Sequence, residues 1–291
     1  MKVKFLLIGV IVTLGMLAGI THAEIDPSWI VGIWMFDEGS GEIAGDVSGN
    51  GHDGTVPGDV KWVDGRFGTA LEFDGSPIPD AGVDAFLDGS VVEVPYHNDL
   101  NLRDVYSLVA WVKADPESAC CNRNPEPWAG IIVKRNHVHD PASGGERNRG
   151  HWGLFVGSDD EIPVALWGNM AEPGGFNQWW LGKSNLLDGE WHHVAAVWDR
   201  VELIFYVDGV DDTSEDGEVS GDAMGVIEQP LTIGGDLNDH YFTGVIDEAA
   251  IFSEPLSEGE IQDVMGGLGQ YATAVDSYGK LAVTWASIKA Q

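Results

Sequence analysis

The turn at residues 46–51 carries residue types that a hard cation prefers. Asp46 and Asn50 supply a carboxylate and an amide, and the glycines between and after them bend the backbone so that carbonyls can turn inward. Ca²⁺ takes roughly six to eight oxygen ligands of these kinds. The same two residues also form Asx turns without any ion. The turn therefore predicts either a calcium site or a hydrogen-bonded turn.

Tryptophan is the second resource, with 12 residues in the chain. Indole rings stack on the apolar faces of sugars, while side-chain amides bond their hydroxyls. Several tryptophans lie in or beside Gly-, Pro- and Asn-rich segments, and we expect the segments 115–129 and 136–150 to be loops that form a binding rim. The ligand-binding candidates are Trp128, Trp167, Asn177, Gln178, Trp179 and Trp180. Ordinary packing of these aromatic side chains over a sheet is the alternative.

Catalytic patterns are weak in this sequence. A retaining glycosidase needs two carboxyls about 5–5.5 Å apart, and the closest segment, 246–251, places Ala, Ala and Ile where the partners of its acids should stand. No Gly-x-Ser-x-Gly elbow, His-Glu-x-x-His motif or phosphate loop occurs. We therefore expect a non-catalytic protein. The alternatives are a divergent glycan hydrolase or lyase, or a purely structural cell-surface protein.

Two pairs of histidines have positions that could form a site. His137 and His139 have metal-like spacing, but no third ligand stands nearby, so a polar loop is favoured. His192 and His193 lie in an expected central strand, where alternation turns one side chain inward and one outward. We expect the inward histidine to be a hydrogen-bonded core residue.

The elements that must position these residues are mostly strands. Residues 202–207 alternate as a half-buried strand does, and Asp208-Gly209 then gives a hairpin signal. Eleven such segments predict an antiparallel sandwich: 29–36, 70–73, 90–94, 106–113, 130–134, 152–156, 163–167, 191–198, 202–207, 231–233 and 244–252. One short helix is expected after Ser257, with Glu260 completing a capping box, and we expect it to lie across a sheet edge.

Five blocks follow one another along the chain: WMFDEGSG at 34–41 with DVSGNG at 46–51, ALEFDG at 70–75, GEWHHVA at 189–195, FYVDG at 205–209, and FTGVIDE at 242–248 with LSE at 256–258. Together they resemble the LamG-like (laminin G or pentraxin-like) jelly-roll domains of the concanavalin A-like lectin/glucanase superfamily. The resemblance covers roughly 29–268. It implies an all-β jelly-roll sandwich of two antiparallel sheets with one short C-terminal helix.

The resemblance also implies an extracellular module that commonly binds calcium, and often glycans or proteins. In similar folds a calcium ion joins an N-terminal turn to the strand that carries the late Ile-Asp-Glu. Carried over, Asp46, Asn50 and Asp247 are the implied calcium ligands, and the ion is structural. The implied partner is a glycan or an extracellular protein.

The N-terminus has the features of an export signal. Lys2 and Lys4 precede an apolar run at 5–20, and small residues allow cleavage after Ala23. Sixteen apolar residues fall short of the roughly 20 that span a bilayer, so an uncleaved anchor is the weaker alternative and no membrane span is expected after cleavage. The expected domains are a signal peptide at 1–23, a LamG-like domain at 24–270 and a tail at 271–291. The protein is expected to be secreted or at the cell surface.

Charge and cysteine usage add two constraints. With 47 Asp and Glu against 15 Lys and Arg, the net charge of −32 repels phosphate and excludes nucleic acid as a partner. Cys120 and Cys121 are the two cysteines and are adjacent. They form a strained disulfide bond, stay as thiols or bond another chain. No disulfide framework therefore holds this fold together.

Overall fold

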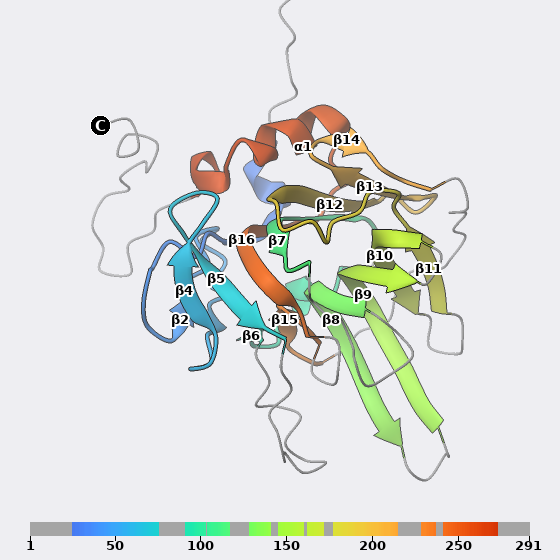
Figure 1. Ribbon diagram of the computed structural model, residues 1–291, viewed down its shortest axis with the longest axis horizontal. Helices are drawn as coiled ribbons and strands as arrows, with labels where there is room; N and C mark the ends of the chain where they lie inside the picture. The colour runs from blue at the N-terminus through green and yellow to red at the C-terminus, as the bar shows by residue number, and fades with distance from the viewer. Residues whose placement is uncertain are drawn as a thin grey trace, which may run out of the picture.

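Two antiparallel β-sheets form the body of the protein (Figure 1). The computed structural model describes residues 25–75, 91–102, 104–116, 128–140, 145–159, 162–171, 177–214, 228–236 and 241–272. The first sheet, called sheet A here, has the order β14-β13-β12-β7-β16-β5-β4, and β1 also pairs with β16. The second, sheet B, has the order β11-β10-β9-β8-β15-β6-β3-β2. This is the predicted two-layer all-β architecture.

The chain crosses between the two sheets repeatedly, with runs of one to four consecutive strands in each. Sheet A contains β1 (Ile30–Trp34), β4 (Lys61–Asp64), β5 (Thr69–Asp74), β7 (Tyr106–Ala114), β12 (His192–Trp198), β13 (Leu203–Val207), β14 (Val210–Asp211) and β16 (Thr243–Phe252). Sheet B contains β2 (Ile43–Ala44), β3 (Gly54–Thr55), β6 (Val92–Val94), β8 (Trp128–Asp140), β9 (Gly145–Asp159), β10 (Ile162–Ala171), β11 (Asn177–Leu181) and β15 (Leu231–Ile233). The short helical elements are η1 (Pro27–Trp29), η2 (Asn98–Leu100), α1 (Glu258–Met265) and η3 (Leu268–Gln270).

The main core lies between the two sheets. Along β12, Val194, Ala196 and Trp198 belong to this core, whereas Ala195 and Val197 belong to a second cluster. Successive strand residues point to opposite faces, so both faces of this central strand are apolar and buried. The continuous apolar run at 194–198 is explained by this position.

The second apolar cluster covers the outer face of sheet A. Its helical members Ile261 and Val264 are buried with strand residues such as Val109 and Phe252. Ser257 caps α1, and both bonds of the predicted capping box with Glu260 are present. The helix was predicted to lie across a sheet edge, which is wrong. It packs on the face because strand residues there turn apolar side chains outward as well as inward.

All eleven predicted strand segments are found, but several strands were missed. The missed strands β2, β3, β4 and β14 have only two to four residues, too short to show a period. The strand β11 was missed as well, because its tryptophans were placed in or beside a Gly-, Pro- and Asn-rich segment. The predicted loop at 136–150 is also wrong for 136–140 and 145–150, which belong to the long β8–β9 hairpin (Figure 1). His137 and His139 therefore lie on a strand.

Three predictions fall outside the described residues. They are the export signal at 1–23, the state of Cys120 and Cys121, and the tail from 273 onward. Within the ranges given above, no helix combines the length and apolar character needed to cross a membrane.

Candidate functional site

Asp46, the first predicted calcium ligand, holds its turn against the strand β1. Its Oδ1 accepts hydrogen bonds from the backbone N–H groups of Ile33 at 3.0 Å and Ser48 at 2.9 Å. Its Oδ2 accepts from the Ser48 hydroxyl at 2.8 Å and the His52 N–H at 3.0 Å. Four donors therefore surround this carboxylate, which is the hydrogen-bonded Asx turn of the alternative interpretation.

Asn50 and Asp247 lie against different segments. The Asn50 amide nitrogen donates to the backbone oxygens of Ile30 at 2.9 Å and Val31 at 3.0 Å. Asp247 on β16 instead accepts from the Phe67 N–H at 2.9 Å, in the turn between β4 and β5. Thus Asn50 fastens the turn to β1, and Asp247 fastens the β4–β5 hairpin to the centre of sheet A.

A β-bulge explains why two adjacent acids of β16 are both buried. The register with β7 shifts between Asp247 and Ala250, and Glu248 has a positive φ of 45°. Asp247 and Glu248 are 0% and 2% exposed. The Glu248 Oε2 accepts from the Leu268 N–H at 2.6 Å. These two acids therefore stabilise the fold and do not line an open cleft as a glycosidase pair would.

Burial makes Asp247 an unusual acid. Loss of solvation is the largest cause that raises its pKa to about 7, and the nearby charges of Glu248 and Asp37 raise it further, against hydrogen bonds from two N–H groups. The turn that faces it is crowded, since a Cβ on Gly65 would lie 2.6 Å from Asp247 Oδ2. Asp247 is therefore partly protonated near neutral pH.

These contacts bear on whether calcium fits. Calcium needs ionised or carbonyl oxygens with free lone pairs that converge on one point. The Asp46 oxygens already accept four hydrogen bonds, and Asp247 is a buried acid held by Phe67 and its own neighbour. The present donor arrangement does not fit a calcium cage. Calcium binding by Asp46, Asn50 and Asp247 stays a prediction from the resemblance.

The backbone register divides the six ligand-binding candidates between the two faces of sheet B. Leu154 belongs to the core between the sheets, so Phe155 beside it on β9 belongs to the outer face. Trp167 pairs with Phe155, and Trp179 pairs with Asn169 on the same strand β10. Trp167 and Trp179 are therefore positions of the outer face.

The other candidates follow from the same register. Trp128 pairs with Gly157, two residues from Phe155, and Asn177 is two residues from Trp179, so both are outer-face positions. Gln178 and Trp180 alternate with them and are core-face positions. Four of the six candidates thus share one face of the strands β8, β10 and β11.

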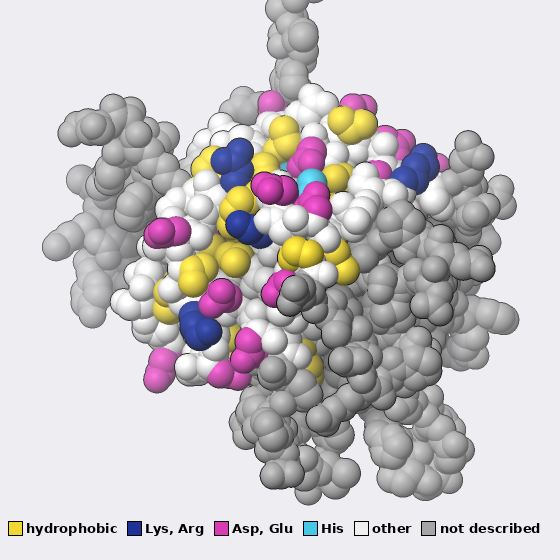
Figure 2. Space-filling model, viewed as in Figure 1, with side chains coloured by type: hydrophobic (Ala, Val, Ile, Leu, Met, Phe, Trp, Pro, Cys, Tyr) yellow, Lys and Arg dark blue, Asp and Glu magenta, His cyan; other side chains and the backbone are white. Residues whose placement is uncertain are grey.

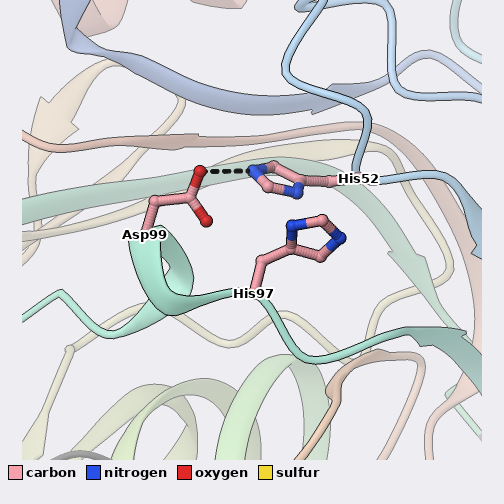
Figure 3. A group of neighbouring side chains, drawn as sticks. All are labelled: His52, His97 and Asp99. Atoms are coloured by element: carbon pink, nitrogen blue, oxygen red, sulfur yellow. Dashed lines mark hydrogen bonds and ion pairs between the residues drawn. The ribbon is translucent and has the colours of Figure 1, made fainter.

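One group of side chains was missed by the sequence reasoning. His52, His97 and Asp99 point toward one another in Figure 3, and one ligand atom from each lies within 4.8 Å of the others. They are separated by up to 47 residues and match no motif. The pairing of β3 with β6, in which Thr55 lies opposite Glu93, brings these residues together. This pairing was not predictable, because β3 has two residues.

The histidines of β12 differ from the prediction in one respect. His193 is 1% exposed and packs against Trp111, with ring centroids 5.5 Å apart. Its Nδ1 has no hydrogen-bond partner among the described residues, so the expected hydrogen-bonded core histidine is wrong for this atom. Desolvation lowers the pKa of His193 to about 4. His192 bonds Asp208 at 2.9 Å and Asp188 at 3.2 Å.

Acidic side chains occur at many places on one face of the protein. On the face in Figure 2 they are dispersed among neutral groups, with few Lys and Arg side chains. This dispersion fits solubility at a net charge of −32 and marks no single acidic patch on that face.

Comparisons with known proteins agree with this fold. A family model described as the concanavalin A-like lectin/glucanases superfamily (Laminin_G_3) matches residues 88–262. A search of the curated proteins finds no significant match. Among solved structures, domain 4 of AbnA, a GH43 extracellular arabinanase from Geobacillus stearothermophilus in complex with arabinotriose, is similar with a TM-score of 0.53 and 19% identity, over 81% of this chain and 97% of that one.

Two further similar structures have larger chains. The binding domain of Paraclostridial Mosquitocidal Protein 1 is similar with a TM-score of 0.56 and 14% identity, over 82% of this chain and 52% of that one. Trypanosoma rangeli sialidase in complex with 2,3-difluorosialic acid is similar with a TM-score of 0.53 and 17% identity, over 90% of this chain and 36% of that one. The chain thus spans about half of the toxin chain and about a third of the sialidase chain. At these identities the likeness shows the fold.

Proposed function

The chain belongs to the concanavalin A-like lectin/glucanases superfamily, and we propose that it is an exported, non-catalytic recognition module that binds carbohydrate or a surface protein. The observation that carries the proposal is the shared outer face of Trp128, Trp167, Asn177 and Trp179 on sheet B. Aromatic and amide residues at positions of one sheet face are the residue types that bind a sugar.

The similar structures support binding as the activity. The arabinanase domain is described in complex with arabinotriose, and a botulinum neurotoxin type C structure is described with entry dependent on two ganglioside molecules. The binding domain of botulinum neurotoxin DC is described in complex with rat synaptotagmin II. The fold therefore carries both glycan and protein partners elsewhere, which is why the proposal names both classes.

Hydrolysis is the second candidate, because the fold also occurs in a sialidase structure. Against it stands the position of the strongest acidic pair of the sequence, Asp247 and Glu248, which are buried and bonded to backbone N–H groups. Reducing-sugar release from mixed plant and microbial polysaccharides tests this candidate directly. Sustained release by the purified chain would overturn the non-catalytic proposal.

A matched pair of variants tests the binding face. We expect Trp179→Ala to weaken the binding of an oligosaccharide found on a glycan array at least about ten-fold, the loss of one stacking contact of about 1.4 kcal/mol, with an unchanged melting temperature. Trp180→Ala, at a core-face position, is expected to lower the melting temperature instead. Equal loss of binding in both variants would contradict the face assignment. If the array gives no hit, we expect the wild type to capture a surface protein and the Trp179→Ala variant to lose that capture. Capture that the variant retains would overturn the proposed binding face.

A further inference from the structure

We propose that His52, His97 and Asp99 form a binding site for a divalent transition-metal ion of the zinc class. One ligand atom from each residue lies within 4.8 Å of the other two. Figure 3 shows the two imidazoles and the carboxylate converging from two separate segments. Zinc sites with three protein ligands and an open fourth position use such sets of imidazole and carboxylate groups.

The fold brings these residues together at the end of one strand pair. His52 precedes β3, and His97 follows β6, whose antiparallel pairing runs through Thr55 and Glu93. Continuing that register places the start of β3 beside the end of β6, so the two histidines meet. The short helix η2 then directs Asp99 back toward them. The site thus joins the β2–β3 loop to the segment after β6.

His52 is held rigidly before any ion binds. The backbone N–H of His52 donates to Asp46 Oδ2 at 3.0 Å, and its backbone carbonyl accepts from the Trp34 indole N–H at 2.8 Å. The His52 side chain is 0% exposed. Asp46, predicted as a calcium ligand, is therefore a positioning residue for this site.

The imidazole of His52 has an unused lone pair in either tautomer. Its Nε2 lies 3.1 Å from Asp99 Oδ2, whereas its buried Nδ1 has no hydrogen-bond partner among the described residues. With the proton on Nε2, the lone pair of Nδ1 is free. With the proton on Nδ1, the lone pair of Nε2 faces a carboxylate oxygen, and a shared cation stabilises that arrangement. An ion shared by Nε2 and Asp99 uses this second tautomer.

The other two ligands can adjust to an ion. Asp99 has 57% of its side chain exposed, and His97 caps η2 without a side-chain hydrogen bond. Around a tetrahedral ion with bonds of about 2.0–2.1 Å, ligand atoms stand roughly 3.3 Å apart. The 3.1 Å separation of His52 Nε2 and Asp99 Oδ2 is already close to this value.

The ligand chemistry selects the class of ion. Imidazole nitrogen suits zinc, copper and nickel, whereas calcium and magnesium prefer oxygen. Two of the three groups are imidazoles, so zinc is expected to bind and calcium is not. The net charge of −32 raises the local concentration of any cation without choosing among them.

The site is tested by isothermal titration calorimetry, in which ZnCl₂ is added to the full chain after treatment with EDTA and dialysis. We expect saturable binding and a melting temperature that rises with zinc concentration, because an ion that binds the folded state stabilises it. His97→Ala is expected to weaken zinc binding at least about ten-fold and to lose the zinc-dependent rise, with the melting temperature in EDTA unchanged. Asp99→Asn should reduce affinity in the same direction.

The matched control is His192→Ala, which removes an imidazole that bonds two aspartates, Asp188 and Asp208, outside the group. It should bind zinc as the wild type does. Cobalt provides a second readout, because tetrahedral Co²⁺ absorbs visible light and His97→Ala should abolish that absorption. A wild type without saturable zinc binding, or a His97→Ala variant that binds zinc equally, would overturn the proposal. Both results are independent of the glycan assay.

Discussion

Asp46 and Asp247 were predicted to share one calcium ion, yet the structure gives them contrasting surroundings. Asp46 accepts four hydrogen bonds from three residues in a half-buried turn. Asp247 accepts two and is completely buried beside another acid, with its pKa raised to about 7. Both carboxylates anchor backbone N–H groups, but the deeper burial of Asp247 beside Glu248 raises its pKa.

The largest expected effect comes from removing the anchor. Asp46→Ala deprives the N–H groups of Ile33 and His52, and both donors of Ser48, of their acceptor. An unsatisfied donor that stays buried costs about 1–3 kcal/mol. We expect the free energy of unfolding, measured with urea, to fall by about 3–5 kcal/mol.

Asp46→Asn serves as the control, because the amide keeps one acceptor oxygen and the shape of the side chain. Its loss should be roughly half as large. If Asp46→Ala unfolds at the same urea concentration as the wild type, the four hydrogen bonds do not anchor the turn.

The second effect is a pH dependence of stability that comes from Asp247 and not from Asp46. Because the pKa of Asp247 is raised from 3.8 to about 7, the folded chain holds a proton between about pH 4 and 7 that the unfolded chain releases. This group therefore makes stability fall as pH rises through that window. His193, with its pKa lowered from 6.5 to about 4, makes stability rise with pH between about 4 and 6.5. The two contributions oppose each other.

Asp247→Asn removes the first contribution and leaves the second. Relative to the wild type, the variant should gain stability steadily from pH 4 to 7, by at most about 4 kcal/mol for a shift of about three units. Urea unfolding at several pH values measures this difference. The lost acceptor gives a constant offset that does not depend on pH. A difference that stays flat from pH 4 to 7 would show that Asp247 is ionised throughout.

The contrast between the two acids also marks where sequence reasoning stops. The strands, the capping box of Ser257 and the jelly-roll fold could be predicted, because periodicity and caps are local signals. The bulge that buries both Asp247 and Glu248 could not, since it depends on a register shift against β7. The same holds for His52 and His97, whose meeting depends on a pairing between very short strands.

The smallest expected effect is the change in melting temperature on adding calcium. It tests the prediction that Asp46 and Asp247 bind one calcium ion. The resemblance predicts that calcium raises the melting temperature, and that Asp46→Asn and Asp247→Asn each abolish the rise. The hydrogen bonds on Asp46 and the protonation of Asp247 predict a shift below about 1 °C between excess calcium and EDTA, because bound donors and a bound proton compete for the same lone pairs. A rise of several degrees that both variants lose would show that the turn and the bulge rearrange around an ion. A rise in melting temperature that only the His97→Ala variant loses would show that calcium binds at His52, His97 and Asp99 instead.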